Sequence, residues 1–378
     1  MRNIVFINQW ASHLTKDIIN AFAAGSDNIA LISGTISETG NPLDKKVKLS
    51  RIIKYNKKTI LSRQISWILA TVQTIFLIIF KYRGYHLFFT SNPPTLAFVP
   101  LFCRNNYSIQ ILDIYPDALV SGKFISNNSW LNKLWVRRNK KYFGYSKNIF
   151  TLTEGMAVTL SQYCSKDRIK VIAQWPSSTG YSKIERTDNI FIKTHALENY
   201  FIVMYSGNIG LGHHVEILVQ IAKILRDQKE ILFVIIGEGW NKSLVERLIK
   251  EYELDNCLLL PYQSESIFKH SIQAADIGVV SVSKELATLC VPIKAYNLIN
   301  NEIPLLCITE EESELALLVS QYDIGKWFIP GQINEMANYI ISLKTGKEII
   351  LKYKGKLRNC SEKFTPQNAF SYVTGFNE

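Results

Sequence analysis

Short apolar runs alternate with amphipathic stretches along almost the whole chain, and this alternation predicts a protein built from repeated strand–helix units. Runs rich in Ile, Val, Leu and Phe are typical of strands that are buried on both faces of a parallel sheet. The stretches between them repeat apolar residues at helical spacing. In the first half the pattern predicts strands at 4–7, 29–33, 87–90, 108–112, 149–152 and 169–172, and helices near 14–23, 60–82, 94–103, 129–143 and 154–163.

The alternation stops between Pro176 and Asn199, where Ser177, Ser178, Thr179, Gly180 and several charged residues are typical of a linker. It then restarts, with strands predicted at 201–205, 232–236, 257–260, 277–282 and 303–308, helices near 214–226, 240–252, 264–274, 293–300 and 332–344, and a last helix after Thr365.

The expected fold is therefore α/β, with two doubly wound, Rossmann-like domains. We assign residues 1–180 to the first domain, 181–199 to the linker, 200–360 to the second domain, and 361–378 to a C-terminal helix that can pack back on the first. Ligands of such sheets bind at the carboxyl ends of the strands, so the expected site is a cleft between the two domains.

Length and cysteine usage agree with a two-domain intracellular protein. A chain of 378 residues is longer than one hydrophobic core usually accommodates, so two domains are expected. The six cysteines include no C-x-x-C pair and most lie in apolar runs, which is typical of reduced thiols in the cytoplasm. The apolar run at residues 4–7 is too short for a secretory signal, so we expect a cytoplasmic location.

Positive charge is concentrated in the first half. Residues 1–180 hold 23 of the 43 Lys and Arg but only 8 of the 32 Asp and Glu. Such charge attracts anionic lipid or nucleic acid, or simply solvates a helix face. No nucleic-acid-binding module accompanies it, so an anionic membrane surface is the preferred partner and nucleic acid is not expected. Most of the excess lies in two clusters: Lys45, Lys46, Lys48, Arg51, Lys54, Lys57 and Lys58, and Lys133, Arg137, Arg138, Lys140, Lys141 and Lys147.

The segment from Gln64 to Phe80 carries no charge between Arg63 and Lys81. A membrane-spanning helix needs roughly 20 apolar residues, and this run is shorter and contains polar residues. It is therefore interpreted as a buried or surface-docked helix, and the protein is expected to lie peripherally on the inner face of the cell membrane.

A glycine-rich stretch, Tyr205-Ser206-Gly207-Asn208-Ile209-Gly210-Leu211-Gly212-His213-His214, follows a predicted strand and opens a helix. Glycines allow a ligand to approach the backbone, and a helix N-terminus favours an anion. The spacing matches neither the dinucleotide fingerprint nor a Walker loop. A plain strand–helix turn remains the alternative.

Two further turns in the second half suit an anion. Ile236-Gly237-Glu238-Gly239 ends a buried strand, and Val291-Pro292-Ile293-Lys294 begins a helix with proline in its first turn. Lys294 could place an ammonium on a phosphate, or could be a solvent-exposed lysine. Three such turns in one domain favour a diphosphate over any single turn.

In the first half, Asp113 follows a predicted strand within Leu112-Asp113-Ile114-Tyr115-Pro116-Asp117, and Thr90-Ser91-Asn92-Pro93-Pro94 ends another. An Asp at a strand's carboxyl end can orient a sugar hydroxyl or accept a proton. The alternative role is to cap the loop.

Taken in order, these motifs resemble the retaining GT-B glycosyltransferases of family four, and most closely members that build bacterial O-antigen and capsule repeat units, such as the N-acetyl-L-fucosamine transferases. The resemblance covers nearly the whole chain. It implies a nucleoside-diphosphate sugar as donor, a saccharide acceptor that is lipid-linked, retention at the anomeric carbon, and no metal or other cofactor. In sequence terms the expected function is a glycosyltransferase of surface polysaccharide biosynthesis.

The resemblance also implies roles for individual residues. Gly207, Asn208, Gly210 and Gly212 match the loop near the donor diphosphate, Glu238 and Gly239 the second glycine turn, and Tyr262 a segment that meets the base. Lys294 matches a basic donor-site position, and Asp113 matches a family Asp that makes it our candidate catalytic residue. The chain departs from the family at Asn297, where a Glu usually holds the ribose, and at Leu112, where a His is usual. Asn208 and His213 or His214 stand where Arg and Lys are usual.

Other chemistries find no support in the sequence. No zinc-type His spacing, Asp-x-Asp pair or Gly-x-Ser-x-Gly elbow is present. Two alternatives to a transferase stay open: a catalytically degenerate scaffold that binds nucleotide sugar or membrane, and a nucleotide-sugar 2-epimerase.

Overall fold

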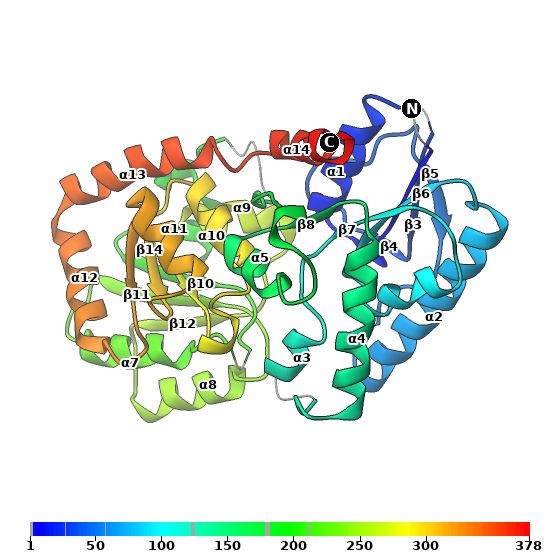
Figure 1. Cartoon of the computed structure of the whole chain (residues 1–378). Coiled ribbons are helices and arrows are strands. Elements are labelled where there is room, and N and C mark those ends of the chain that lie inside the picture. Colours follow the sequence, from blue (N-terminus) through cyan, green and yellow to red (C-terminus); the bar gives the residue numbers. More distant parts are fainter. Residues whose placement is uncertain (1–2, 27, 57, 122–124, 178–181, 211) are drawn as a thin grey trace. The chain divides into compact units, whose positions relative to one another are not determined.

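The computed structural model describes residues 3–26, 28–56, 58–121, 125–177, 182–210 and 212–378. Lys57 of the first basic cluster, Leu211 of the glycine-rich stretch and residues 178–181 at the predicted linker lie outside this description. The chain forms two compact units, one made of residues up to 177 together with 366–378, and the other of 178–365 (Figure 1).

The first unit is built on a parallel seven-stranded sheet in the order β5-β3-β1-β6-β7-β8-β9. Numbered along the chain, the order begins 3-2-1-4-5, which is the doubly wound topology. The strands are β1 (Ile4–Ile7), β3 (Ile29–Ser33), β5 (Lys48–Arg51), β6 (His86–Thr90), β7 (Tyr107–Gln110), β8 (Ile149–Thr151) and β9 (Ile169–Val171), and β2 (Trp10–Ala11) pairs separately with β4 (Thr35–Ile36).

Helices connect most of these strands as the strand–helix alternation predicts, although β3 is followed by β4 and β5 without a helix between them. One departure is the predicted helix at 94–103, which is the 3₁₀ helix η1 (Pro94–Leu101). Pro100 lies inside this helix and lacks the N–H that an α-helix needs there. The others are α1 (His13–Ala23), α2 (Ile60–Phe80), α3 (Asp117–Ser121), α4 (Trp130–Tyr145), α5 (Glu154–Leu160), the short η2 (Lys166–Arg168) and η5 (Pro366–Asn368), and α14 (Ala369–Asn377).

The apolar segment of the sequence forms α2. The helix begins with a capping box, in which the side chains of Thr59 and Ser62 each accept from the other's backbone N–H. By length and composition alone, Leu61–Phe80 could cross a membrane. In this fold Trp67, Thr71 and other residues on one side of the helix are buried, and the Thr71 hydroxyl bonds that of Thr95 on η1 at 2.6 Å. The burial of this side is compatible with a helix docked on a protein surface.

The C-terminal helix α14 completes the core of the first unit. Figure 1 shows it (red) beside α1 (blue), and Phe376 meets Phe22 edge-on at 5.3 Å between ring centroids. The hydroxyl of buried Tyr372 accepts from the Gln110 side chain at 2.9 Å. The last segment of the chain is thus part of the first unit's hydrophobic core.

The second unit repeats the topology with six parallel strands in the order β12-β11-β10-β13-β14-β15, which is 3-2-1-4-5-6 along the chain. Its central strands are buried along their length because the sequence there is almost continuously apolar. The strands are β10 (Phe201–Ser206), β11 (Ile231–Ile236), β12 (Cys257–Leu260), β13 (Ile277–Ser281), β14 (Leu305–Ile308) and β15 (Gly325–Phe328). The helices are η3 (Arg186–Asp188), α6 (Ile190–His195), α7 (Glu216–Ile224), α8 (Lys242–Glu251), α9 (Glu265–Gln273), η4 (Lys284–Leu286), α10 (Ile293–Asn300), α11 (Glu314–Tyr322), α12 (Ile333–Thr345) and α13 (Lys347–Ser361).

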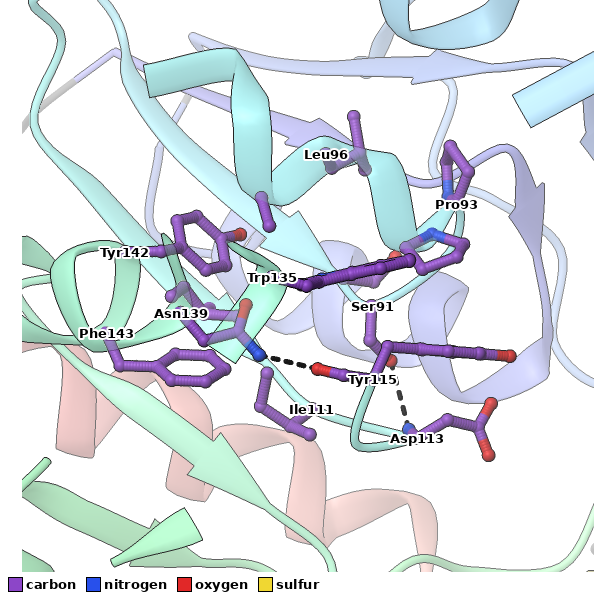
Figure 2. Close-up of a pocket in the computed structure, with 14 residues that line it drawn as sticks. Ser91, Pro93, Leu96, Ile111, Asp113, Tyr115, Trp135, Asn139, Tyr142 and Phe143 are labelled. Carbon is purple, nitrogen blue, oxygen red and sulfur yellow. Dashed lines mark hydrogen bonds between the residues drawn. The ribbon is translucent and has the colours of Figure 1, made fainter. Parts of the chain in front are cut away.

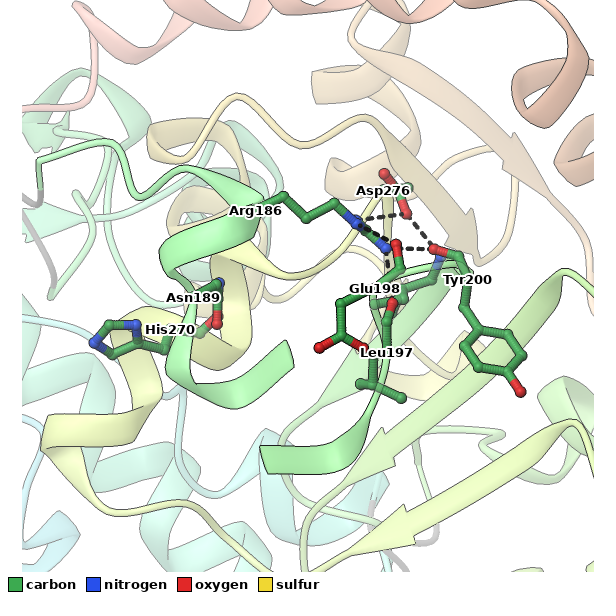
Figure 3. A network of polar contacts seen from close by, with 8 residues as sticks. Arg186, Asn189, Leu197, Glu198, Tyr200, His270 and Asp276 are labelled. Carbon is green, nitrogen blue, oxygen red and sulfur yellow. Dashed lines mark hydrogen bonds and ion pairs between the residues drawn. The ribbon is translucent and has the colours of Figure 1, made fainter. Parts of the chain in front are cut away.

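Much of the stretch predicted as a linker belongs to the second unit. Phe191 and Ile192 of α6 are buried in its core. Arg186 ties the same stretch to the sheet (Figure 3): its guanidinium donates to the backbone oxygens of Leu197, Glu198 and Tyr200 and pairs with Asp276. The Asp276 carboxylate also accepts from the Ile202 N–H at 2.8 Å. Residues 186–202 are therefore packed and hydrogen-bonded against the rest of the second unit.

Candidate functional site

The carboxyl ends of β10 and β13 diverge at the point where the strand order of the second unit reverses, which is where doubly wound sheets bind ligands. A cavity of about 330 Å³ lies there. Its lining contains both apolar and polar residues. Its apolar lining is Met204, Phe268, Ile272, Val279, Ile293 and Leu298, and its polar lining is Ser206, Gly207, Asn208, His213, Tyr262, Gln263, Lys294 and Asn297.

The loop after β10 passes close to the loop after β11 because glycines stand at the contact. A Cβ at Gly237 would lie 1.9 Å from the carbonyl oxygen of Gly207, and the φ of Gly237 is 156°. The two loops are joined by a hydrogen bond from the Ile209 N–H to the Glu238 oxygen at 2.8 Å. The glycine turns of the sequence thus hold the first loop at the rim of the cavity.

Lys294 reaches the same rim from the first turn of α10. Its Nζ donates to the hydroxyl of Tyr205 at 2.8 Å and lies 4.1 Å from the centroid of that ring. A Cβ at Gly207 would lie 3.0 Å from Nζ, so glycine there leaves room for the amine. Burial lowers the pKa of Lys294 to about 7.

The two adjacent histidines have different surroundings. His213 lines the cavity, and its Nδ1 lies 3.2 Å from the Ser281 oxygen; burial lowers its pKa, and the nearby Lys294 charge lowers it further. His214 has a left-handed backbone, with φ of 42°, and its Nδ1 lies 3.5 Å from Glu216 Oε1. The hydrogen bond to Glu216 raises the pKa of His214. Only His213 therefore offers its ring to the cavity.

The structure brings together five of the ten predicted donor-site residues: Gly207, Asn208, Tyr262, Lys294 and Asn297. The other five do not line the cavity: Gly210, Gly212, His214, Glu238 and Gly239. They support the loops instead, since a Cβ at Gly210 would meet the Asn208 side chain, one at Gly239 would meet the Ile209 backbone, and Glu238 pairs with Lys242 at 2.8 Å.

Tyr205 and the apolar lining of the cavity are not among the predicted site residues. Tyr205 stands within the quoted glycine-rich stretch, but its pairing with Lys294, 89 positions away, is a through-space contact. The apolar lining comes from strand and helix positions whose sequence pattern also fits an ordinary core. Only the fold shows that these side chains surround a free space.

Asp113 lies in the first unit, at the carboxyl end of β7. Its backbone N–H and that of Leu112 both donate to the Ser91 hydroxyl, at 3.0 and 2.9 Å. Figure 2 shows its carboxylate pointing away from a small pocket in which the rings of Tyr115 and Trp135 stack at 6.3 Å. The residue is exposed, so its carboxyl is available to a ligand, while the protein packed around it raises the pKa of that carboxyl.

Across the residues that the structure describes, no group of three or more His, Cys, Asp or Glu side chains is placed to hold a metal ion. The acidic and histidine residues near the cavity are instead paired with neighbouring side chains or backbone, as Glu216 is with His214.

Residues 186–362, nearly all of the second unit, match the protein family described as glycosyl transferases group 1. A probable glycosyltransferase WbjE of Pseudomonas aeruginosa is 23% identical over 224 residues, which are 58% of this chain and 54% of that protein. A putative colanic acid biosynthesis glycosyl transferase WcaI of Escherichia coli is 29% identical over 102 residues, 27% and 25% of the two chains. The chain thus spans about half of the first relative and a quarter of the second.

Solved structures match over the full length. WaaG, a glycosyltransferase involved in lipopolysaccharide biosynthesis, has a TM-score of 0.69 at 12% sequence identity, and the match covers 98% of this chain and 100% of that one. Anabaena HepE in complex with UDP and glucose has a TM-score of 0.70 at 13% sequence identity, and the match covers 99% of this chain and 98% of that one. A UDP-forming trehalose-phosphate synthase from Burkholderia xenovorans has a TM-score of 0.74 at 9% sequence identity, and the match covers 100% of this chain and 99% of that one. These likenesses confirm the predicted GT-B fold of two Rossmann-like domains.

Proposed function

We propose that this chain, a group 1 glycosyltransferase of the GT-B fold, moves a sugar from a nucleoside-diphosphate donor to an acceptor hydroxyl in the synthesis of a bacterial surface polysaccharide. The observation that carries the proposal is the cavity at the ends of β10 and β13, where a glycine loop and the Lys294 amine face the same space. Structural neighbours that bind UDP and UDP-glucose support a donor of this class.

In this proposal the polar rim of the cavity holds the donor diphosphate. The amine of Lys294 and the side chain of Asn208 stabilise the charge that develops on the leaving diphosphate, an effect that is often the largest single term in such catalysis. Asn297 can hydrogen-bond a ribose hydroxyl without adding charge. Tyr262 lines the cavity, and about half of its surface is exposed, so its ring can meet the base.

The acceptor side of the proposal rests on Asp113. An exposed carboxylate at the carboxyl edge of a parallel sheet can orient an acceptor or transferred-sugar hydroxyl. We propose a retaining, metal-independent transfer, so that this residue positions the sugar and no metal carries the diphosphate. Because the motifs resemble N-acetyl-L-fucosamine transferases, that sugar is the first donor sugar to test.

We further propose that the acceptor is lipid-linked and that the first unit docks on the inner face of the cell membrane. Both α2 and α4 pack against η1, and each turns apolar side chains to solvent. Exposed basic residues follow along α4, and basic residues beside apolar ones suit an anionic bilayer surface. The exposed apolar residues are Leu61, Ile65, Ile68, Leu69, Val72, Phe76, Ile79 and Phe80 on α2, and Trp130, Leu131 and Leu134 on α4.

A thermal-shift screen of UDP, GDP, dTDP, CDP and ADP, in EDTA, tests the donor site. A ligand that binds only the folded protein stabilises it by about 2.7 kcal/mol at a hundredfold excess over the dissociation constant, and the melting temperature rises as a result. We expect one of these diphosphates to stabilise the wild type and to lose this effect in Lys294→Ala. A folded protein that none of them stabilises would instead favour a scaffold. Conversion of a UDP-sugar with no acceptor present would favour a 2-epimerase.

A further inference from the structure

Tyr205 connects the two polar elements of the cavity rim. It is the penultimate residue of β10, its side chain is fully buried, and its hydroxyl donates to the backbone oxygen of Asn208 at 2.6 Å. A phenol has one proton to donate, so its contact with Lys294 Nζ at 2.8 Å has the lysine as donor and the hydroxyl as acceptor. One side chain therefore holds both the glycine loop and the amine.

The amine of Lys294 is held by an aromatic ring and not by a carboxylate. No ion pair involves it among the residues that the structure describes, although its Nζ lies over the Tyr205 ring and beside Gly207. An ammonium has three donors, and the Tyr205 hydroxyl takes one. Its other donors can therefore meet an anion that enters at Gly207.

We propose that Tyr205 is a positioning residue for the donor diphosphate: its ring and hydroxyl aim the Lys294 amine at the space above Gly207 and fix the Asn208 loop beside it. This inference rests on the proposed donor site. It adds to that site a residue that touches neither the sugar nor the phosphate and acts through Lys294 and the loop.

The charges around the amine give the proposal a second readout. The Lys294 charge lowers the pKa of His213, Cys290 in the loop before α10 acts to raise that of Lys294, and Tyr262 and Glu216 act to raise that of Tyr205. Burial lowers the pKa of Lys294 to about 7, so near pH 8 most empty sites hold a neutral amine. A bound diphosphate favours the ammonium, so binding takes up a proton.

The test is calorimetric titration of the full-length protein with UDP near pH 8, in two buffers that differ in ionisation enthalpy. We expect wild type to take up close to one proton per UDP, and Tyr205→Phe, which keeps the ring, to bind UDP about tenfold more weakly and take up fewer protons. In a Lys294→Ala background the Tyr205→Phe change is expected to weaken UDP binding clearly less than it does in wild type, because only its effect through the Asn208 loop then remains. Tyr339→Phe is the matched control: it removes another buried hydroxyl of the same unit, which lies 3.4 Å from the Leu305 oxygen.

The outcomes separate the two proposals. If wild type, shown to be folded, binds no UDP, the UDP donor fails and the role of Tyr205 fails with it. If wild type binds UDP but Tyr205→Phe matches it in affinity and proton uptake, only the role of Tyr205 is overturned. An equal loss of affinity with and without Lys294 would likewise overturn it, since it would show that Tyr205 does not act through the amine.

Discussion

At the scale of the residue, the amine of Lys294 that we propose for diphosphate binding lowers the stability of the folded protein. Its pKa is about 10.5 in an unfolded chain and about 7 in the folded protein, so the unfolded state binds more protons between these values. The resulting destabilisation is complete below pH 7 and disappears as the pH rises toward 10.5. A desolvated lysine with no carboxylate partner among the described residues is therefore retained at a cost to the fold.

We accordingly expect Lys294→Met to melt about 2–4 °C higher than wild type near pH 6, because the substitution removes the cost of burying a charge. The difference should shrink as the pH rises, and the variant should lose stabilisation by nucleoside diphosphates. Melting curves across this pH range, with and without ligand, measure both effects. A variant that melts lower than wild type at every pH would show that the lysine stabilises the empty site.

Asp113 belongs to the other unit, so its substitution should separate chemistry from donor binding. We expect Asp113→Asn to lower kcat by roughly a hundredfold or more, since positioned proton-transfer groups contribute at least this much. The UDP dissociation constant should not change, because every residue lining the donor cavity lies in residues 178–365. Steady-state kinetics and UDP titration on the same preparation measure both, and an unaltered kcat would remove Asp113 from the proposed mechanism.

How far the sequence predicts the site differs from residue to residue. Gly207 and Lys294 could be predicted because their chemistry shows in local motifs. The choice between His213 and His214 could not, since it depends on the left-handed backbone of His214, which turns that ring to Glu216. Nor could the pairing of Tyr205 with Lys294, which requires β10 and α10 to be placed in the fold.

At the scale of the element, the sequence predicts the strands buried on both faces and the edge strands β9 and β12, but not the edge strands β5 and β15. Edge strand β5 was interpreted only as part of a basic cluster, because three of its four side chains face solvent. Edge strand β15 is not predicted because its four residues, two of them Gly325 and Lys326, form no continuous apolar run. The short helix α6 is not predicted because charged residues surround it in the sequence, although its Phe191 and Ile192 are buried in the core.

The exposed faces of α2 and α4 lead to a prediction about membrane binding. We expect Lys140→Glu/Lys141→Glu to weaken binding to anionic vesicles by tenfold or more, because each basic residue near such a surface contributes about 1 kcal/mol. Phe76→Ser/Phe80→Ser should weaken binding to neutral and anionic vesicles alike, since it removes apolar area. Flotation of vesicles with and without anionic lipid measures this, and Lys193→Glu/Lys250→Glu, which changes exposed lysines of the second unit, is the control. Equal flotation of all variants would argue against docking through these helices.

At the scale of the whole molecule, the chain leaves the first unit at residue 177 and returns to it at 366. Residues 1–177 therefore lack part of their own core, which α14 supplies through Ala369, Tyr372 and Phe376. The donor cavity draws on none of these residues. The stability of the first unit and the ligand affinity of the second should consequently respond to different substitutions.

Phe376 and Phe370 offer a matched test of this independence, since both are phenylalanines of α14 but only Phe376 is buried. We expect Phe376→Ala to destabilise the first unit by about 3–5 kcal/mol, the usual cost of such a truncation in a core, and Phe370→Ala to cost under about 1 kcal/mol. Differential scanning calorimetry with UDP should then resolve two transitions, because UDP stabilises only the unit that binds it. The Phe376→Ala substitution should lower one transition while the UDP-dependent one keeps its temperature. A single transition that both perturbations move together would show instead that the two units unfold as one cooperative body.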